Sequence, residues 1–400
     1  MVGVLSNTWG LTETSMPTNI GWLPVKSGTA ATITAANLAR IQSAATSEVA
    51  QDIVALSTDP EGRLYFEGKP LAKYAYICLT ASDVLNNRAL ALTCLAKLKT
   101  AFARFTQNKQ RYPLVYEASV WRGMVSDAVY QTGDPYADFG SGFYNDHHFH
   151  YAYFIQTAAI LGYLDKKLST GAWVAANKAW VNLLVRDVAN PSAQDTYFPV
   201  FRSFDWFHGH SWAKGLFEST DGKDEESSSE DYNFAYAMKL WGKTAGDAAM
   251  EARGNLMLAI MKRSFNEYML IASSNSNHPA NFAANKLTGI MWENKVHHNT
   301  YFGSNIEYIH GVHMLPLTPM SPYIRSAAYC TEEWDTHFAG KTSGIQDGWR
   351  GILYANVALF KPVSSFNFFK DAAFKSAWLD GGASKTWGLA YAAALGGAAA

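Results

Sequence analysis

Apolar residues recur at intervals of three and four positions along most of the chain, a spacing that predicts amphipathic α-helices rather than strands. Hardly any segment shows the alternation of apolar and polar residues that a half-buried strand requires. The predicted helices cover residues 34–56, 70–86, 88–105, 148–166, 171–189, 230–245, 247–265 and 348–360. The sequence therefore predicts an all-α protein.

Long connections rich in Gly, Asp, His and aromatic residues separate some of these helices. They cover about residues 111–146, 195–227, 272–310 and 330–348. Loops of this length inside a compact domain are more often functional than accidental. Paired helices in a ring, with the long loops gathered at one end as the rim of a cleft, fit this pattern better than a sheet-centred fold. Because no linker divides the chain, we expect a lead-in segment over residues 1–30 and one helical domain over residues 31–400.

The composition favours a neutral ligand. The 400 residues include 33 Lys and Arg against 34 Asp and Glu, a formal net charge of -1, so no global field attracts nucleic acid or an anionic membrane. Aromatic residues make up 14% of the chain, and sugars are a ligand class that stacks on such rings. No segment approaches the ~20 apolar residues that span a bilayer, and residues 1–22 lack the pattern of a signal peptide. We expect a monomer that binds neither nucleic acid nor membranes.

The cysteines Cys78, Cys94 and Cys330 are odd in number and widely spaced, which indicates neither a disulfide framework nor a zinc knuckle. Cysteine is commonly buried as a small hydrophobic residue. We therefore expect buried free thiols.

The stretch "GKDEESSSEDYNFAY" sets Glu226 and Glu230 four positions apart where a helix is predicted to begin. Like charges at this spacing on one helix face repel each other. Ser, Asp and Glu are favoured in a first helical turn by capping and by the helix dipole, which explains one acid better than two. The pair therefore suggests a charged site beside the Trp- and His-rich loop that precedes it.

A second acidic position lies in "DFGSGFYNDHHFHYAYFIQTAAIL", where Asp146 stands at a loop-to-helix junction and His150 follows one helical turn later. Asp146 has two interpretations: it caps the helix, or it is one member of a carboxylate pair whose proton affinity is tuned by its surroundings. The run "HHFH" also raises the question of a metal site. We expect none, because His147 and His148 point in different directions and no second His or Cys cluster supplies further ligands.

The loop "FDWFHGHSW" combines hydrogen-bonding groups with aromatic faces. A carbohydrate groove requires this mixture, although a well-packed helix entry has the same composition. Both interpretations stay open at this point.

Four stretches together resemble glycoside hydrolase family 81, the endo-β-1,3-glucanases: "YNDHHFHYAYF", "FDWFHGHSWAKG", "DEESSSEDYN" and "IEYIHGVHMLPLTP". They occur in the family's order, and the resemblance covers about residues 110–360. It implies an (α/α)6 barrel that hydrolyses internal β-1,3-glucosidic bonds of laminarin-, callose- or fungal-wall-type glucan with inversion, without a metal or organic cofactor. It also implies an extracellular or cell-wall location.

The resemblance carries over roles for individual residues. Asp146 is similar to the family's general acid, with His150 helping to hold it, and Glu226 is similar to the general base. Glu230 would position water or sugar, and the sequence leaves the base assignment open between Glu226 and Glu230. The implied sugar-site residues are Tyr144, Asp205, His210, Trp212 and Asn233.

The chain departs from the family pattern in places. No part of it resembles the family's N-terminal β-sandwich, and Glu117, Arg122 and Ala152 stand where the pattern has Asp, Gly and Gly. These changes bear on substrate contacts more than on the catalytic pair. Two other functions compete: a glucan-binding protein without turnover, and a helical-barrel polysaccharide lyase, whose acidic substrate would require a basic cleft.

Overall fold

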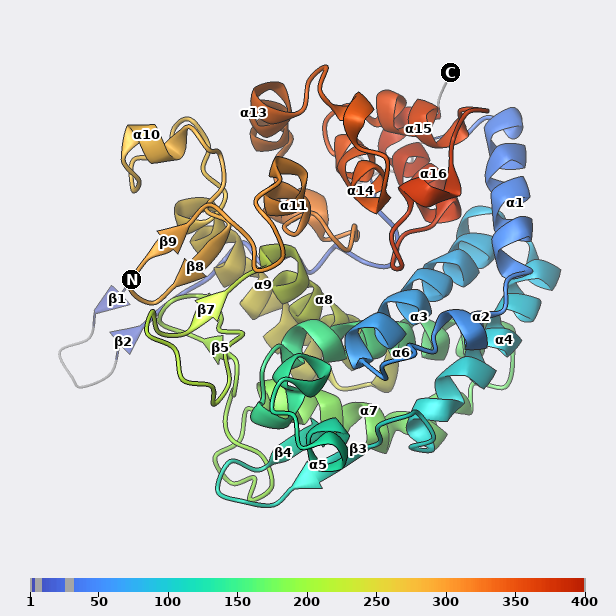
Figure 1. Ribbon diagram of the computed structural model, residues 1–400. Coiled ribbons are helices and arrows are strands. Elements are labelled where there is room, and N and C mark those ends of the chain that lie inside the picture. The colour runs from blue at the N-terminus through green and yellow to red at the C-terminus, as the bar shows by residue number, and fades with distance from the viewer. Residues whose placement is uncertain (1, 4–8, 26–31, 399–400) are drawn as a thin grey trace.

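The computed structural model describes residues 2–3, 9–25 and 32–398, and helices dominate it (Figure 1). The longer helices are α1 (Ala35–Val49), α3 (Leu64–Leu79), α4 (Arg88–Thr106), α6 (His147–Leu168), α7 (Trp173–Ala189), α8 (Ser228–Ala245), α9 (Ala248–Tyr268) and α13 (Ala327–His337). The shorter helices are α2 (Ile53–Leu56), α5 (Ala128–Thr132), α10 (Ala280–Ala283), α11 (Ile306–Gly311), α12 (Ser321–Ile324), α14 (Gly348–Val357), α15 (Pro362–Lys370) and α16 (Lys385–Ala392). The prediction of an all-α protein is confirmed.

The helices alternate between an outer and an inner ring. The inner helices are α3, α6, α8, α11, α14 and α16, and the outer helices are α1, α4, α7, α9, α13 and α15. Helices α6 and α8 are buried on almost every side, as expected for inner helices, whereas α4 and α9 each expose one face. A small cavity of about 50 Å³ between the inner helices is lined by Tyr76, Gln156, Ile352 and Trp387 among others. This arrangement is the (α/α)6 barrel that the family resemblance implies.

The two ends of the described helical region close the ring. Helix α1 packs against α16, so that the blue and red parts of the chain lie side by side (Figure 1). The Glu48 carboxylate of α1 accepts hydrogen bonds from the backbone N–H groups of Lys385 (2.9 Å) and Thr386 (3.0 Å). These N–H groups at a helix start have no intrahelical partner, so Glu48 satisfies them from another helix.

Some predicted helix limits are wrong because a capping side chain lies inside the predicted helix or comes from a distant part of the chain. The helix predicted over residues 34–56 is two helices, since the Asp52 side chain accepts from Val54 and Ala55 and starts α2. The helix predicted from residue 70 begins at Leu64, whose N–H donates to the Asp138 carboxylate at 2.9 Å. A cap that distant in the sequence leaves no local signal.

Short strand pairs that the sequence does not indicate lie in the long loops and, for β1 and β2, in the N-terminal segment. The strands are β1 (Val2–Gly3), β2 (Trp9–Gly10), β3 (Leu114–Glu117), β4 (Gly123–Ser126), β5 (Phe204–Asp205), β6 (His210–Ser211), β7 (Asp224–Glu225), β8 (Ile290–Trp292) and β9 (Val296–His297). The β7–β8 pairing joins two of the predicted loops to each other. The fourth predicted loop, residues 330–348, is wrong in its first part, which belongs to α13.

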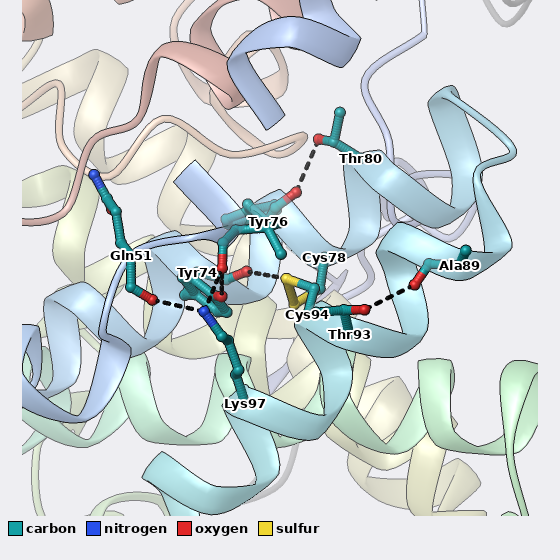
Figure 2. Close-up of a disulfide and its surroundings, with 10 residues drawn as sticks. Gln51, Tyr74, Tyr76, Cys78, Thr80, Ala89, Thr93, Cys94 and Lys97 are labelled. Atoms are coloured by element: carbon teal, nitrogen blue, oxygen red, sulfur yellow. Dashed lines mark hydrogen bonds between the residues drawn. A yellow bond between two sulfur atoms is a disulfide. The ribbon is translucent and has the colours of Figure 1, made fainter. Parts of the chain in front are cut away.

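The expectation of free thiols is wrong for two cysteines. Cys78 on α3 and Cys94 on α4 form a disulfide, and Cys330 is a buried free thiol. Figure 2 shows the disulfide between the two helices, beside Tyr74 and Lys97. The 16-residue spacing of Cys78 and Cys94 does not by itself indicate a disulfide. The two cysteines lie on consecutive helices that pack together, and this packing places their Cα atoms 5.3 Å apart.

Part of the lead-in segment packs on the barrel. The Lys239 ammonium of α8 donates to the carbonyl oxygens of Pro17 (2.5 Å) and Ile20 (2.7 Å). The division into a lead-in and a barrel domain stays a prediction, and its boundary at residues 30 and 31 lies outside the described residues. Among the described helices, none has the length and apolar character needed to cross a membrane.

Candidate active site

A cleft of about 520 Å³ opens at the N-terminal ends of the inner helices. Its lining comes from the first turns of α3, α6, α8 and α14 and from the loops around them. The lining residues are Tyr65, Phe66, Lys69, Phe139, Asp146, Phe149, His150, Glu226, Glu230, Phe302, Val312, Leu315, Asp347, Gly348, Trp349, Ile352, Asp380 and Gly381. The catalytic residues expected from the sequence, Asp146, Glu226, Glu230 and His150, thus share one cleft.

Asp146 immediately precedes α6 in a left-handed conformation (φ 60°). Its side chain makes no capping hydrogen bond, so the interpretation of Asp146 as a helix cap is wrong. Burial, followed by the negative charge of Glu226, raises the pKa of the Asp146 carboxyl well above its usual range. Such a group keeps its proton where an ordinary aspartate has lost it.

Glu226 does not lie on the helix that carries Glu230, contrary to the expectation of a pair on one helix face. It follows β7 and precedes Ser227, whose side chain caps α8. The backbone N–H of Tyr301 donates to the Glu226 carboxylate at 3.4 Å. Burial raises the pKa of Glu226 to about 7, while the Tyr301 N–H and the charge of Lys214 oppose that rise.

Glu230 lies in the first turn of α8, buried at 4% exposure. The hydroxyl of Tyr153 donates to its carboxylate at 2.5 Å. Burial raises the pKa of Glu230, and the nearby Lys69 ammonium and the Tyr153 and Tyr65 hydroxyls work against the increase. The Glu230 carboxylate thus accepts a shorter hydrogen bond than the Glu226 carboxylate does.

His150 reaches the cleft from α6, but its ring does not bond to Asp146. The contact between the two is the helical backbone bond from the His150 N–H to the Asp146 carbonyl, 3.0 Å. The ring packs near Tyr65 and Phe139, and its buried Nδ1 has no hydrogen-bond partner. Burial lowers the pKa of His150 to about 3, so the ring is neutral near pH 7.

The residues expected to bind sugar lie elsewhere. Tyr144 and Trp212 line a second hollow of about 430 Å³ beside the cleft, together with Trp121 and Lys214. Neither hollow is lined by the other three expected residues, Asp205, His210 and Asn233.

Two of those three have local contacts that explain the loop composition. Asp205 accepts from the N–H groups of Phe207 (2.8 Å) and His208 (3.1 Å) and so fixes a tight turn. The His210 ring is buried and bonds to the Ser211 carbonyl at 2.7 Å.

Comparison with known proteins shows which family the chain belongs to. The family model described as "Glycosyl hydrolase family 81 C-terminal domain" matches residues 32–389. The chain belongs to glycoside hydrolase family 81. It is 49% identical, over 97% of its length and 43% of the relative, to a glucan endo-1,3-beta-D-glucosidase of Arthroderma benhamiae. It is 42% identical, over 99% of its length and 50% of the relative, to glucan endo-1,3-beta-D-glucosidase 2 of Saccharomyces cerevisiae.

A solved family 81 structure has the same fold. The Clostridium thermocellum protein superposes with a TM-score of 0.70 at 24% identity, covering 93% of this chain and 49% of that one. The chain spans half or less of the length of these family 81 relatives.

The histidine run of this family 81 chain has structural partners. His147 Nδ1 lies 2.6 Å from Asp187, and His148 Nε2 lies 3.3 Å from Glu225. Within the described part of the chain, no group of His, Cys, Asp and Glu side chains is arranged to hold a metal ion.

Sequence reasoning missed part of this family 81 site. Tyr65 and Lys69 precede the predicted start of their helix, and Asp380 lies in a C-terminal region where no element was expected. Phe302 and Trp349 also escaped notice, although their rings stack at 5.8 Å on the cleft wall. The one available signal was the spacing of Tyr65 and Lys69, which fits one face of a helix.

Proposed function

We propose that the chain hydrolyses internal β-1,3-glucosidic bonds of β-1,3-glucan with inversion. The observation that carries the proposal is the convergence of Asp146, Glu226 and Glu230 in one cleft walled by aromatic rings. The relatives named glucan endo-1,3-beta-D-glucosidases support the choice of substrate.

Asp146 acts as the general acid and Glu226 as the general base. An inverting glycosidase protonates the leaving oxygen with one carboxyl group and activates water on the opposite sugar face with another. Burial and the charge of Glu226 raise the pKa of Asp146 well above its usual range, which keeps its proton available for the leaving oxygen. The Tyr301 N–H and the charge of Lys214 favour the ionised form of Glu226, which a general base requires.

Glu230 orients the water or a sugar hydroxyl. Its carboxylate is held by the Tyr153 hydroxyl, and this fixed geometry suits a positioning role better than proton transfer. His150, neutral and packed beside Tyr65, supports the wall next to Asp146.

The cleft wall suits a neutral sugar. Phe66, Phe139 and Phe302 are 41%, 42% and 53% exposed, and such faces stack on the C–H faces of pyranose rings. The charged lining is mostly acidic, namely Asp146, Glu226, Glu230, Asp347 and Asp380 against Lys69. A lyase for acidic polysaccharides would need the opposite charge.

Proton NMR of the first products from linear β-1,3-glucan, with a soluble cellulose derivative as control, tests the proposal. We expect α-anomeric oligosaccharides of several lengths from the β-1,3-glucan alone. Initial β-anomers would contradict inversion. Binding without product release would favour the glucan-binding alternative.

The base assignment has its own test. In Glu226→Ala, sodium azide should restore turnover and give an α-glycosyl azide, because azide needs no deprotonation and fits the vacated space. Glu230→Ala should show no such rescue. Rescue of Glu230→Ala alone would exchange the two roles.

A further inference from the structure

A line of polar contacts runs from Glu230 along the lining of the cleft to the loop before α16. Asp380, in the loop before α16, accepts from the Lys69 ammonium at 2.7 Å. The same ammonium lies 3.3 Å from the hydroxyl oxygen of Tyr65, one helical turn earlier on α3. Tyr65 lines the same cleft as Glu230, and its hydroxyl lowers the pKa of the Glu230 carboxyl, which also accepts from the Tyr153 hydroxyl at 2.5 Å.

The direction of these bonds follows from the chemistry of the groups. An ammonium only donates, so the Tyr65 oxygen must accept from Lys69. A tyrosine hydroxyl has a single proton, which is then free to point at Glu230. Without Lys69, that hydroxyl could rotate toward another acceptor. Lys69 therefore fixes which way the Tyr65 proton points.

We propose that Lys69, anchored by Asp380, is a positioning residue that acts through Tyr65 to keep the Glu230 carboxylate ionised and correctly oriented. The inference deepens the proposed hydrolysis and rests on it. None of the sequence motifs of this chain includes Lys69, Tyr65 or Asp380.

The packing around Lys69 holds its side chain in one place. Lys69 is 8% exposed. A Cβ added at Gly382 would lie 3.0 Å from the Lys69 Cε, so this glycine gives the lysine stem its space. The N–H of Gly382 also donates to Asp380 at 3.2 Å, which fixes the carboxylate that anchors Lys69.

The charges around Lys69 come from each element that packs against it. Asp380 faces it from the loop before α16, Glu230 from α8, and Tyr65 from its own helix. Burial alone would lower the pKa of Lys69, but these groups raise it, so the ammonium stays charged. Lys73, one turn further along α3, also faces Asp380. Lys69 therefore links two acids of the cleft lining, Asp380, which anchors it, and Glu230.

The test compares Lys69→Met, Lys69→Arg and Tyr65→Phe with the unmodified chain by pH profiles of kcat and KM on linear β-1,3-glucan. Lys69→Met should lower kcat at least about tenfold and steepen the low-pH limb, because Glu230, without the opposite charge that favoured its ionisation, then has to lose a proton in the same pH range as Glu226. Lys69→Arg, which keeps a donor and a charge, should recover part of kcat. Tyr65→Phe combined with Lys69→Met should cost little more than Lys69→Met alone, since both act on one bond.

A measurement independent of turnover separates failure of the inference from failure of the proposed function. Infrared titration of protein with ¹³C-labelled glutamate, using Glu230→Gln to assign the band, should show Glu230 protonating at higher pH in Lys69→Met. If Lys69→Met does not fold, Tyr65→Phe serves in the same titration, because it removes only one hydroxyl. An unchanged Glu230 titration, or an unchanged pH profile with normal turnover, would overturn the inference. An unmodified chain that never cleaves glucan would instead contradict the proposed function.

Discussion

Asp146 and Glu226 line the same cleft from the N-terminal ends of α6 and α8, inner helices that pack against each other. Burial raises the pKa of Asp146, and the charge of Glu226 raises it further. The two carboxyls are therefore coupled, since an ionised Glu226 makes it harder for Asp146 to lose its proton. This coupling ties the proposed acid role of Asp146 to the charge of Glu226.

Replacing the acid should stop cleavage of natural glucan. Asp146→Asn removes the proton donor for the leaving oxygen, and general acid catalysis typically contributes ~10²–10⁴-fold. We expect kcat/KM on linear β-1,3-glucan to fall within that range, measured by released reducing sugar.

Asp205→Asn is the matched control, because Asp205 fixes a turn outside the cleft. It should keep most of the activity. A loss as large as that of Asp146→Asn would support the sugar-binding role expected from the motif.

Lys214 should set the pH range of activity. Its charge lowers the pKa of both Asp146 and Glu226, so Lys214→Met should raise both. Activity needs ionised Glu226 and protonated Asp146, so both limbs of the pH profile of kcat/KM should move upward by ~1 pH unit or less. Lys223 lines the same second hollow as Lys214, so Lys223→Met is the control and should leave the pH profile of kcat/KM unchanged. Movement of one limb alone would mean that Lys214 acts on one carboxyl only.

Asp138 should make stability fall as pH rises. Burial raises its pKa to about 8 in the folded chain, against ~3.9 in an unfolded one. Its contribution to stability is therefore fully present below about pH 4 and is lost as pH rises through about 8. Asp138→Asn keeps an acceptor for the Leu64 N–H and abolishes this ionisation.

Thermal unfolding from pH 4 to 8 measures the effect. The Asn variant should be more stable than the parent chain at pH 8, by about 1 kcal/mol or more, since each unit of pKa corresponds to about 1.4 kcal/mol. The difference should shrink toward pH 4. A constant difference across this range would show that Asp138 does not titrate between the folded and unfolded states.

The long helices were predictable because their signals are local. Periodic apolar residues mark α4, α6 and α8, and side chains such as Ser227 and Asp247 cap α8 and α9 from the adjacent position. The family resemblance of the motifs predicted that Asp146, Glu226 and Glu230 belong to one site, and all three line the same cleft.

The remaining features depend on partners that are distant in the sequence. The start of α3 is set by Asp138, and the anchor of Lys69 is Asp380. The residues of each pair are too far apart in the sequence for the periodicity of apolar residues to reveal their contact. The sugar-binding role of Asp205 and His210 stays a prediction, since both side chains contact local backbone groups in a loop whose composition also suits a sugar site.

The disulfide between Cys78 and Cys94 should contribute measurably to stability. The two cysteines are 16 positions apart, and a disulfide closing a loop of about 15 residues contributes ~3 kcal/mol by restricting the unfolded chain. The double variant Cys78→Ala/Cys94→Ala should therefore unfold at lower denaturant concentration than the parent chain, and added reductant should not affect it. Cys330→Ala, which replaces the buried free thiol, is the control, since its unfolding midpoint should still fall when reductant is added.

Because α3 also carries Tyr65 and Lys69, the double variant should lose stability without a change in the pH profile if the disulfide acts only on the unfolded state. A changed profile would mean that it also holds α3 in place at the cleft.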